Sequence, residues 1–389
     1  MNRIYLDNAA TTPVSKRVLD RMLPYFTDHF GNASSIYETG RDARKAVDTA
    51  RRQAAAAINA KPQEIYFTAG GSESDNWAIK GAAFARRNKG NHIITTSVEH
   101  HAVLHTCEWL VGQGFEVTYL PVDEYGQVSA RQVEEAIRDN TILITIMAAN
   151  NEIGTLMPIR QIAEIARARG ILMHTDAVQA MGAVPIDTAA WGVDMLSLSA
   201  HKFHGPKGVG LLYIRTGVRI DPLVHGGAQE RGKRAGTENL PAIVGMGEAI
   251  EIAAANCAEN AERLTLLRDD LIRRLMAAIP DIRLNGHPTQ RLPGNVNISV
   301  RYIEGEALLL RLDLAGIAAS SGSACTSGSL DPSHVLLAIG LPHEIAHGSL
   351  RFSLSDNSTR EDIDEVVRVL PGIVSTLRDM SPIFPRKEV

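Results

Sequence analysis

The sequence has little of what would mark a secreted, membrane or nucleic-acid-binding protein. It holds 3 cysteines, Cys107, Cys257 and Cys325, and this odd number forms no complete disulfide framework, which predicts a reducing compartment. Lys and Arg number 40 against 44 Asp and Glu, so no basic excess exists to bind nucleic acid. The start, MNRIYLDNAATTP, lacks the apolar core of a signal peptide, and no apolar run approaches the roughly 18 to 20 residues of a membrane span. We therefore expect a cytoplasmic protein with no membrane or nucleic-acid partner.

The chain does contain enough apolar material for a large core. Its 389 residues are 44% hydrophobic, and that length predicts two or three domains. Short runs rich in apolar and β-branched residues occur at 64–68, 92–96, 115–120, 142–147, 171–175, 195–199 and 210–214. Such continuous runs are typical of strands that are covered on both faces. Helical patterns lie between several of them, including 157–170, where Gly170 suits a helix C-cap. This alternation predicts an α/β domain with a largely parallel sheet.

The C-terminal third has a different pattern. A long helical stretch follows Pro241 and runs to about Ile279, and it could carry the chain from one domain into the next. A strand at 294–300, a helix at 304–315, a strand at 348–355 and a helix from Glu361 follow. These elements predict a smaller α+β domain.

One cysteine lies in an unusual setting. The segment SSGSACTSGS, residues 320–329, surrounds Cys325 with serine and glycine, which predicts a mobile, exposed loop. Either this thiol is incidental, or the protein needs a reactive sulfur that can move. Cys107 and Cys257 lie in helical patterns among apolar residues, where structural cysteines are buried and inert.

Four segments that follow predicted strands carry unusual chemistry, and ligands of open α/β sheets bind at such strand ends. In AGGSESDN, residues 69–76, Ser72 and Asp75 form a capping-box pattern after two glycines, so the segment is either an anion site or a plain helix start. In SVEHHAVLH, residues 97–105, His100, His101 and His105 are candidates for ring stacking, for proton transfer or, less favoured, for a metal.

The other two segments add an acid and a lysine. Asp176 is either a helix cap or the partner of a protonated heterocyclic nitrogen, and Gln179 lies one turn onward. Lys202, at the end of a predicted strand, is either solvated or desolvated enough to bond an aldehyde, and Ser199 and His201 could donate to a phosphate. Pyridoxal phosphate would use all of these groups. Asp176 and Lys202 are 26 positions apart, about one strand–connection–strand unit, so both can face one crevice.

These residues stand in motifs that resemble the NifS-type cysteine desulfurases, a branch of the fold-type I pyridoxal-phosphate enzymes. The similar segments run nearly end to end: YLDNAATTP, FTAGGSESDN, VEHHAV, ANNEIGTLMPI, HTDAVQA, SAHKFHGPKGVG, RAGTEN, SSGSACTSGS and RFSLS. The resemblance implies a large cofactor-binding domain at 13–257 with a mostly parallel seven-stranded sheet. It also implies a small α+β domain of residues 1–12 and 258–389 that carries the Cys325 loop.

The resemblance also implies residue roles. Lys202 would bond the cofactor aldehyde, Asp176 would pair with the pyridine nitrogen, Gln179 would bond the ring hydroxyl, and His100 would stack on the ring and move protons. The phosphate would be held by Gly71, Ser72, Ser199 and His201, with Thr237 from the neighbouring subunit of an obligate homodimer. Asn150 and Arg351 would fix the substrate carboxylate, Asn150 also lying beside the cofactor. Two positions depart from the family pattern, since Ser72 replaces a common threonine and His101 a frequent proline.

The activity implied is the conversion of L-cysteine to L-alanine, with the sulfur transferred to Cys325 as a persulfide. No intrinsic metal is implied, although the persulfide could transiently contact an iron–sulfur cluster. The acceptor stays open among an iron–sulfur scaffold protein, nitrogenase maturation and tRNA thiolation. Two other enzyme activities, aminotransferase and selenocysteine lyase, and a non-enzymatic assembly role are the alternatives. The Cys325 loop favours sulfur chemistry over transamination, because transamination needs no mobile thiol.

Overall fold

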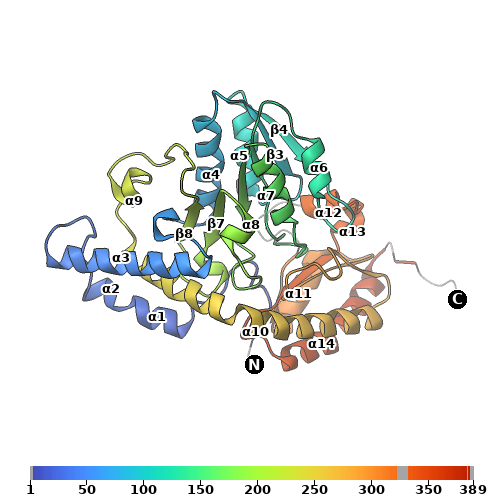
Figure 1. The fold of residues 1–389 in the computed structure, drawn as a ribbon. Coiled ribbons are helices and arrows are strands. Elements are labelled where there is room, and N and C mark those ends of the chain that lie inside the picture. The colour runs from blue at the N-terminus through green and yellow to red at the C-terminus, as the bar shows by residue number, and fades with distance from the viewer. Residues whose placement is uncertain (1–2, 322–331, 383, 386–389) are drawn as a thin grey trace.

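The central element of the protein is a seven-stranded sheet. The structure is a computed structural model that describes residues 3–321, 332–382 and 384–385, so Cys325 lies outside the described residues. The strand order is β2–β8–β7–β6–β5–β3–β4 (Figure 1). The strands are β2 (Ile65–Thr68), β3 (His92–Thr96), β4 (Glu116–Leu120), β5 (Thr141–Thr145), β6 (Leu172–Asp176), β7 (Met195–Ser199) and β8 (Gly210–Ile214). Each predicted run overlaps one of these strands, and the predicted α/β fold is confirmed.

The sheet is mostly parallel, with one reversed strand. β4, β3, β5, β6 and β7 pair in parallel, whereas β8 is antiparallel to both β7 and β2. Only residues 200–209 join β7 to β8. A parallel pair needs a crossover of about a dozen residues or more, so this short connection returns the chain in the opposite direction.

Helices cover both faces of the sheet. One face packs against α4 (Gly71–Ala85) and α5 (His101–Val111). The other packs against α3 (Glu38–Ala57), α7 (Ile159–Ala168) and the first part of α10 (Leu240–Ala278). Shorter helices are η1 (Pro62–Glu64), α6 (Ala130–Glu135), α8 (Thr188–Trp191), η2 (Ala200–Lys202) and α9 (Gln229–Gly232). Gly170 follows the end of α7 at a φ of 67°, as the predicted glycine stop requires.

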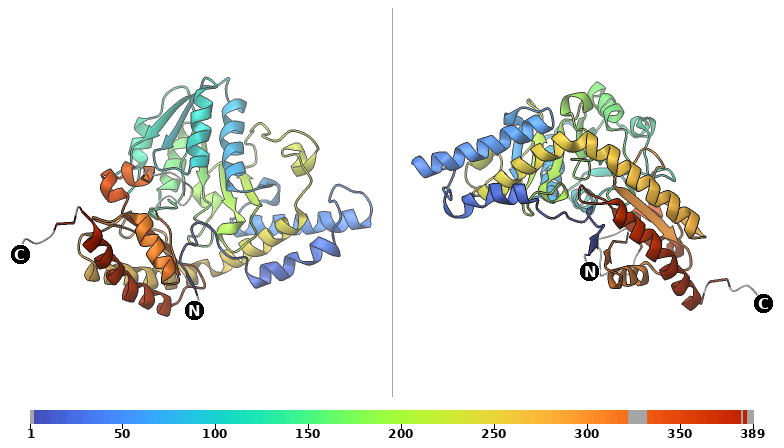
Figure 2. Two further views of the ribbon diagram at one scale, coloured as in Figure 1. Left: turned by 180° about the vertical axis from the view of Figure 1, so that it is seen from behind. Right: turned by 90° about the horizontal axis from the view of Figure 1, so that it is seen from below.

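A second buried core lies beside the first (Figure 2). Its antiparallel sheet has the order β12 (Ser349–Ser353), β10 (Asn295–Val300), β9 (Ile282–Leu284), and α11 (Gly305–Leu314), α14 (Arg360–Met380) and the end of α10 cover it. β1 (Ile4–Tyr5) pairs with β11 (Ile317–Ala318), which brings the first described residues to this core. α12 (His334–Ala338) and α13 (His343–Ala346) contribute to the first core instead.

Helix α10 runs through both cores. Over one 18-residue window its mean hydropathy is 1.2, enough in length and composition to cross a membrane, which the sequence analysis did not expect of any segment. However, 61% of that window is buried inside the protein, against α3 among other elements. The apolar composition is therefore accounted for by packing in the fold.

The N-terminal helices project from the body. α1 (Lys16–Met22), α2 (Pro24–Thr27) and the start of α3 extend away from the main sheet (Figures 1 and 2). Large apolar side chains are exposed along this projection: Leu19, Leu23, Phe26, Phe30, Ile36 and Tyr37. Solvent-exposed apolar patches of this kind commonly mark an interaction surface.

Candidate active site

Polar side chains gather at the edge of the sheet where the parallel strands end. β6 ends at Asp176, and β7 ends at Ser199, which is followed by His201 and Lys202. β2 is reversed relative to β8, so its carboxyl end, which leads into Gly71 and Ser72, lies at the same edge. The structure therefore brings these predicted residues to one side of the sheet.

The turn between β2 and α4 differs from the predicted capping box. The helix starts directly after Gly70, which has no side-chain cap bond, so Ser72 lies inside the first turn and does not cap it. Asp75 is 1% exposed and points into the core. Glu73 instead closes the turn before the helix, because its Oε2 accepts the N–H of Ala69 at 2.8 Å. The capping-box prediction was wrong because the helix starts earlier, after Gly70, whose positive φ of 157° suits glycine.

The start of α4 borders a cavity of about 570 Å³. Its lining includes Gly71, Ser72, Ser199 and His201, together with Thr11 of the N-terminal segment. A helix N-terminus without a side-chain cap presents unpaired N–H groups and the positive end of the helix dipole, and it favours an anion. A Cβ on Gly71 would lie 2.8 Å from a Val178 methyl carbon, so only glycine fits there. Two hydroxyls and an imidazole around uncapped amides suit a phosphate group.

Lys202 is held by the N-terminal segment. Its Nζ donates to the carbonyl oxygens of Ala9 at 2.5 Å and Ala10 at 2.9 Å. Gln179 Nε2 also donates to Ala9 O, at 3.0 Å. The sequence motif YLDNAATTP contained this segment, but sequence reasoning assigned it no function. These bonds cross more than 160 residues of chain, and no local pattern predicts them.

Asp176 is a buried acid with an adjacent cation. It is 7% exposed, and Oδ1 accepts the N–H of Val178 at 2.9 Å. Burial raises its pKa to about 6, while that hydrogen bond and the charge of Lys202 oppose the rise. The carboxylate is therefore predominantly ionised above pH 6, as the partner of a protonated ring nitrogen must be.

A polar layer lies beneath Asp176. In the register of the sheet Asp176 faces Ser197, and His174 lies two residues earlier on the same strand face. His174 shares hydrogen bonds with Thr145 at 2.8 Å and with Ser197 at 3.0 Å. Burial lowers the pKa of His174 to about 3 and, with Asp176 nearby, raises that of Asp75 well above its usual value. His174 is therefore uncharged near neutral pH, and burial disfavours the charged form of Asp75.

His100 caps helix α5. Its Nδ1 accepts the N–H of Ala102 at 3.0 Å. Burial, reinforced by the charge of Lys202, lowers its pKa to about 4, so the ring is neutral near neutral pH. The rings of His101 and His105 stack at 5.0 Å. Among the residues that the structure describes, no group of three or more His, Cys, Asp or Glu has an arrangement that could hold a metal, so the metal alternative gains no support.

Arg351 is the buried cation of the site. It is 1% exposed, Nη1 donates to Asn151 O and Nη2 donates to Asp7, both at 2.9 Å. Its buried Nε has no hydrogen-bond partner within the described residues. An unpaired, buried guanidinium N–H is a donor for a carboxylate. Asp7 and Ala9 are two residues apart, so one segment contacts both Arg351 and Lys202.

Three further residues were predicted for the site. Asn150 is fully buried. Its Nδ2 donates to Val98 O, and its Oδ1 accepts the N–H groups of Glu152 and Ile153, so its side-chain amide bonds the backbone of the protein. Thr237 is exposed on the loop before α10 and is not among the lining residues of the 570 Å³ cavity. Cys325 lies outside the described residues.

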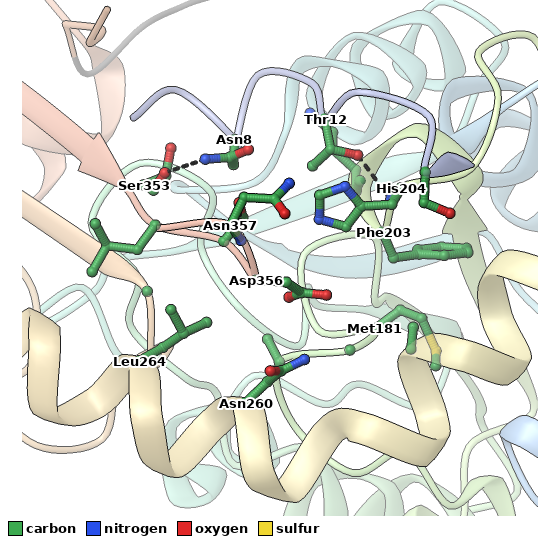
Figure 3. A pocket seen from close by; sticks show the side chains of 18 of the residues that line it. Asn8, Thr12, Met181, Phe203, His204, Asn260, Leu264, Ser353, Asp356 and Asn357 are labelled. Atoms are coloured by element: carbon green, nitrogen blue, oxygen red, sulfur yellow. Dashed lines mark hydrogen bonds between the residues drawn. The ribbon is translucent and has the colours of Figure 1, made fainter. Parts of the chain in front are cut away.

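A second cavity of about 470 Å³ also borders the N-terminal segment. Lys202 and Gln179 line it together with Asn8 and Thr12. Figure 3 shows Met181, Phe203 and His204 along one side, with Asn260 and Leu264 of α10 below and Asp356 and Asn357 between. The N-terminal segment therefore contributes to both cavities, through Thr11 to the first and through Asn8 and Thr12 to the second, and Lys202 lines the second.

The residues present fit pyridoxal phosphate. The uncapped start of α4 and the Gly71 cradle suit the phosphate, and the buried Asp176 suits a ring nitrogen. Lys202 follows Ser199 and His201, which line the 570 Å³ cavity, and its amine suits an aldehyde. The cofactor would provide an electron sink next to a bound amino acid.

Comparisons with known proteins agree with this geometry. The family model of the class-V aminotransferases matches residues 4–366. A cysteine desulfurase IscS of Methanosarcina thermophila is 62% identical over 384 residues, which cover 99% of this chain and 95% of that protein. A cysteine desulfurase IscS of Clostridium botulinum is 57% identical over 387 residues, 99% of this chain and 98% of that protein.

Solved structures are similar over nearly the whole chain. A NifS-like protein superposes with a TM-score of 0.91 at 40% identity, covering 96% of this chain and all of the other. The structure of SspA in complex with cysteine superposes with a TM-score of 0.81 at 41% identity, covering 90% of this chain and 98% of that one.

Proposed function

The chain belongs to the class-V aminotransferase family, whose members use pyridoxal phosphate, and we propose that it is a cysteine desulfurase. The reaction takes L-cysteine and the thiol of Cys325 to L-alanine and a Cys325 persulfide. The carbon–sulfur bond of cysteine breaks, a sulfur–sulfur bond forms on Cys325, and a proton replaces sulfur on the substrate carbon. Relatives that share more than half of their residues with this chain bear that activity in their names.

One observation carries the proposal: the side chains of Lys202 and Arg351 both contact the same N-terminal segment. Lys202 donates to Ala9 and Ala10, and Arg351 donates to Asp7, so an amine and a buried cation stand a few residues apart along that segment. Arg351 suits the α-carboxylate of an amino acid, and the Lys202 amine suits the aldehyde of the cofactor with which the α-amino group of the amino acid would also react. The SspA structure, which contains cysteine, is 41% identical to this chain.

Each residue has a defined task in this reaction. When bound, the cofactor supplies the electron sink that makes the α-proton of the substrate acidic. Lys202 would remove the α-proton of the substrate as a general base, and Arg351 would fix the carboxylate. Asp176, ionised above pH 6, would hold the ring nitrogen in its protonated form. Neutral His100 would stack on the ring and move protons.

The enzyme acts as a homodimer in this proposal. The projecting α1–α3 region exposes apolar side chains such as Phe26, Phe30 and Ile36, which a second copy would cover. Thr237, exposed on its own subunit, would then complete the phosphate site of the partner. Asn150 keeps a role in ordering the turn beside the substrate, consistent with its backbone bonds.

The location, domains and acceptor are further parts of the proposal. A nucleophilic thiol at Cys325 needs a reducing compartment, so we place the enzyme in the cytoplasm. We assign a large domain to 13–257 and a small domain to 1–12 and 258–389; the two buried cores support this division except at α12 and α13, which pack in the first core. The persulfide sulfur goes to an iron–sulfur scaffold or another sulfur-acceptor protein.

The variant Cys325→Ser tests the function. We expect it to bind pyridoxal phosphate and to change the cofactor absorbance when cysteine is added, but to release no sulfide and form no persulfide. Alanine and keto acid are measured in parallel, because keto acid in place of alanine would indicate transamination. Wild-type sulfide release by Cys325→Ser would refute the assignment of the nucleophile.

A further inference from the structure

The loop between β8 and α10 is tied to the body by charged side chains. The ion pairs join Arg51 to Glu230, Arg234 to Glu73 and Arg44 to Glu238. Arg44 and Arg51 belong to α3 and Glu73 to α4, so the loop is attached at separate points. An exposed loop of this length is normally mobile, and these ties restrict it.

The ion pair between Arg234 and Glu73 lies at the candidate active site. Arg234 Nε and Nη2 donate to the two carboxylate oxygens at 2.8 and 3.0 Å, a bidentate arrangement. The side chains are 21% and 17% exposed, so solvent screens the pair less than a surface ion pair. The hydrogen bonds to Glu73 raise the pKa of Arg234.

Glu73 also belongs to the phosphate-binding turn. Its Oε2, which accepts from Arg234, accepts the N–H of Ala69 as well, and Glu73 lines the 570 Å³ cavity. The carboxylate therefore fixes the entry to α4, where Gly71 and Ser72 present the phosphate donors. A change in the position of Glu73 moves that turn and Arg234 together.

Arg234 stands three residues before Thr237. The N–H of Gly236 donates to Gln229 Oε1 at 3.1 Å, which closes the intervening turn. Glu73 thus fixes the first residue of the segment from Arg234 to Thr237, and Gln229 fixes the turn within it. The position of the Thr237 hydroxyl therefore depends on the contact between Arg234 and Glu73.

We propose that Glu73 and Arg234 form a positioning pair that links the two active sites of the dimer. The pair holds the phosphate-binding turn of its own subunit and, through Thr237, holds the hydroxyl that completes the partner's phosphate site. This inference rests on the proposed function, which supplies the dimer and the role of Thr237. Each cofactor phosphate is then positioned by one such pair from its own chain and by another from the partner.

The phosphate gives a direct readout besides activity. We expect Arg234→Met to weaken pyridoxal phosphate binding by about tenfold or more, the effect of losing a charge-assisted bidentate contact. Binding of pyridoxal, which lacks the phosphate, should stay within about twofold of wild type. Arg138→Met makes the same chemical change in an exposed pair with Glu116, more than half exposed, and should alter neither affinity.

Folding is checked with the same proteins. Sedimentation and thermal unfolding show whether Arg234→Met remains a folded dimer. If it does not, Arg234→Lys is used in its place, because lysine keeps the charge but lacks the two-pronged guanidinium. Arg234→Lys should show an intermediate loss of phosphate-dependent affinity. Equal weakening of pyridoxal and pyridoxal phosphate would overturn the proposal, since it would indicate general damage.

Mixed dimers test the link between subunits. In the first, a Lys202→Ala chain pairs with an Arg234→Met chain, so the lysine-bearing site has an altered turn and a normal partner loop. In the second, a Lys202→Ala/Arg234→Met chain pairs with a wild-type chain, so the turn is normal and the partner loop is altered. We expect weaker phosphate-dependent binding than in a Lys202→Ala/wild-type dimer in both. Wild-type affinity in either mixed dimer would refute the link.

The failure of this inference differs from failure of the proposed function. If Thr237→Ala weakens pyridoxal phosphate binding while Arg234→Met does not, the dimeric site stands and the positioning pair is refuted. If the protein is a monomer, or if Lys202→Ala keeps a covalently bound cofactor, the proposed function itself fails.

Discussion

Replacement of Arg51 tests how the loop that precedes α10 is stabilised. Arg51 Nη1 and Nη2 donate to the two carboxylate oxygens of Glu230 at 2.7 and 2.8 Å, and both side chains are less than 10% exposed. Arg51 also donates to Ile65 O, and Glu230 accepts from Phe67 N at 3.1 Å. The variant Arg51→Met keeps an apolar side chain of similar length and removes the charge.

The size of the effect follows from burial and backbone conformation. Breaking a buried ion pair leaves an uncompensated charge and costs about 3–5 kcal/mol, a large part of a typical stability of about 5–15 kcal/mol. Glu230 and Arg231 also have left-handed φ values of 46° and 59°. That conformation costs a non-glycine residue about 1–2 kcal/mol, and the bonds of Glu230 offset it. Arg51→Met/Glu230→Met removes both charges, so it should recover at least about 2 kcal/mol of the single variant's loss.

Equilibrium unfolding in urea measures these changes. All variants are compared at one protomer concentration and with saturating pyridoxal phosphate, because dimerisation and ligand binding add to apparent stability. Arg138→Met, which breaks an exposed pair, should lose no more than about 1 kcal/mol. A loss below about 1 kcal/mol for Arg51→Met, or a double variant no more stable than the single one, would contradict the reasoning.

Other residues give shorter tests. Lys202→Ala should purify without borohydride-reducible cofactor, as measured by mass spectrometry of the reduced protein; a covalent adduct in this variant would contradict its role. Iodoacetamide should modify Cys325 first and leave Cys107 unmodified in the folded protein, because burial raises the pKa of Cys107 to about 12; peptide mapping decides this, and early labelling of Cys107 would count against it. Burial raises the pKa of Glu152 to about 7 from 4.5, so the stability associated with its neutral form is present below pH 4.5 and lost as the pH rises through 7. Glu152→Gln should therefore become more stable relative to wild type by up to about 3 kcal/mol between those pH values, and a constant difference across them would refute the shift.

The strands and the cofactor chemistry could be predicted from local sequence. Strands such as β5 and β7 are buried at every position, so each appears as a continuous apolar or β-branched run. Asp176 and Lys202 follow such runs, and strand ends are where ligands bind in this type of sheet. The residue types then restrict the choice of ligand, because a lysine, an acid and phosphate donors together suit pyridoxal phosphate.

Local sequence patterns did not predict where helix α4 starts or in which direction β8 runs. The Ser72 and Asp75 pattern predicted a capping box, but the helix starts earlier, after Gly70, and Glu73 bonds the turn before it. The reversal of β8 was also not predicted, since a run of apolar residues has no direction. It depends on the short connection from β7, which cannot cross to a parallel neighbour.

The sequence by itself determined which residue types are available and where the buried strands lie, because these depend on composition and short-range periodicity. Only the tertiary structure decided which groups act together. Asp7 holds Arg351 from 344 residues away, Ala9 holds Lys202 from 193 residues away, and Glu73 joins a cofactor turn to a distant loop. Such contacts form when the whole chain packs, so their partners are set by the fold and not by any neighbouring residues.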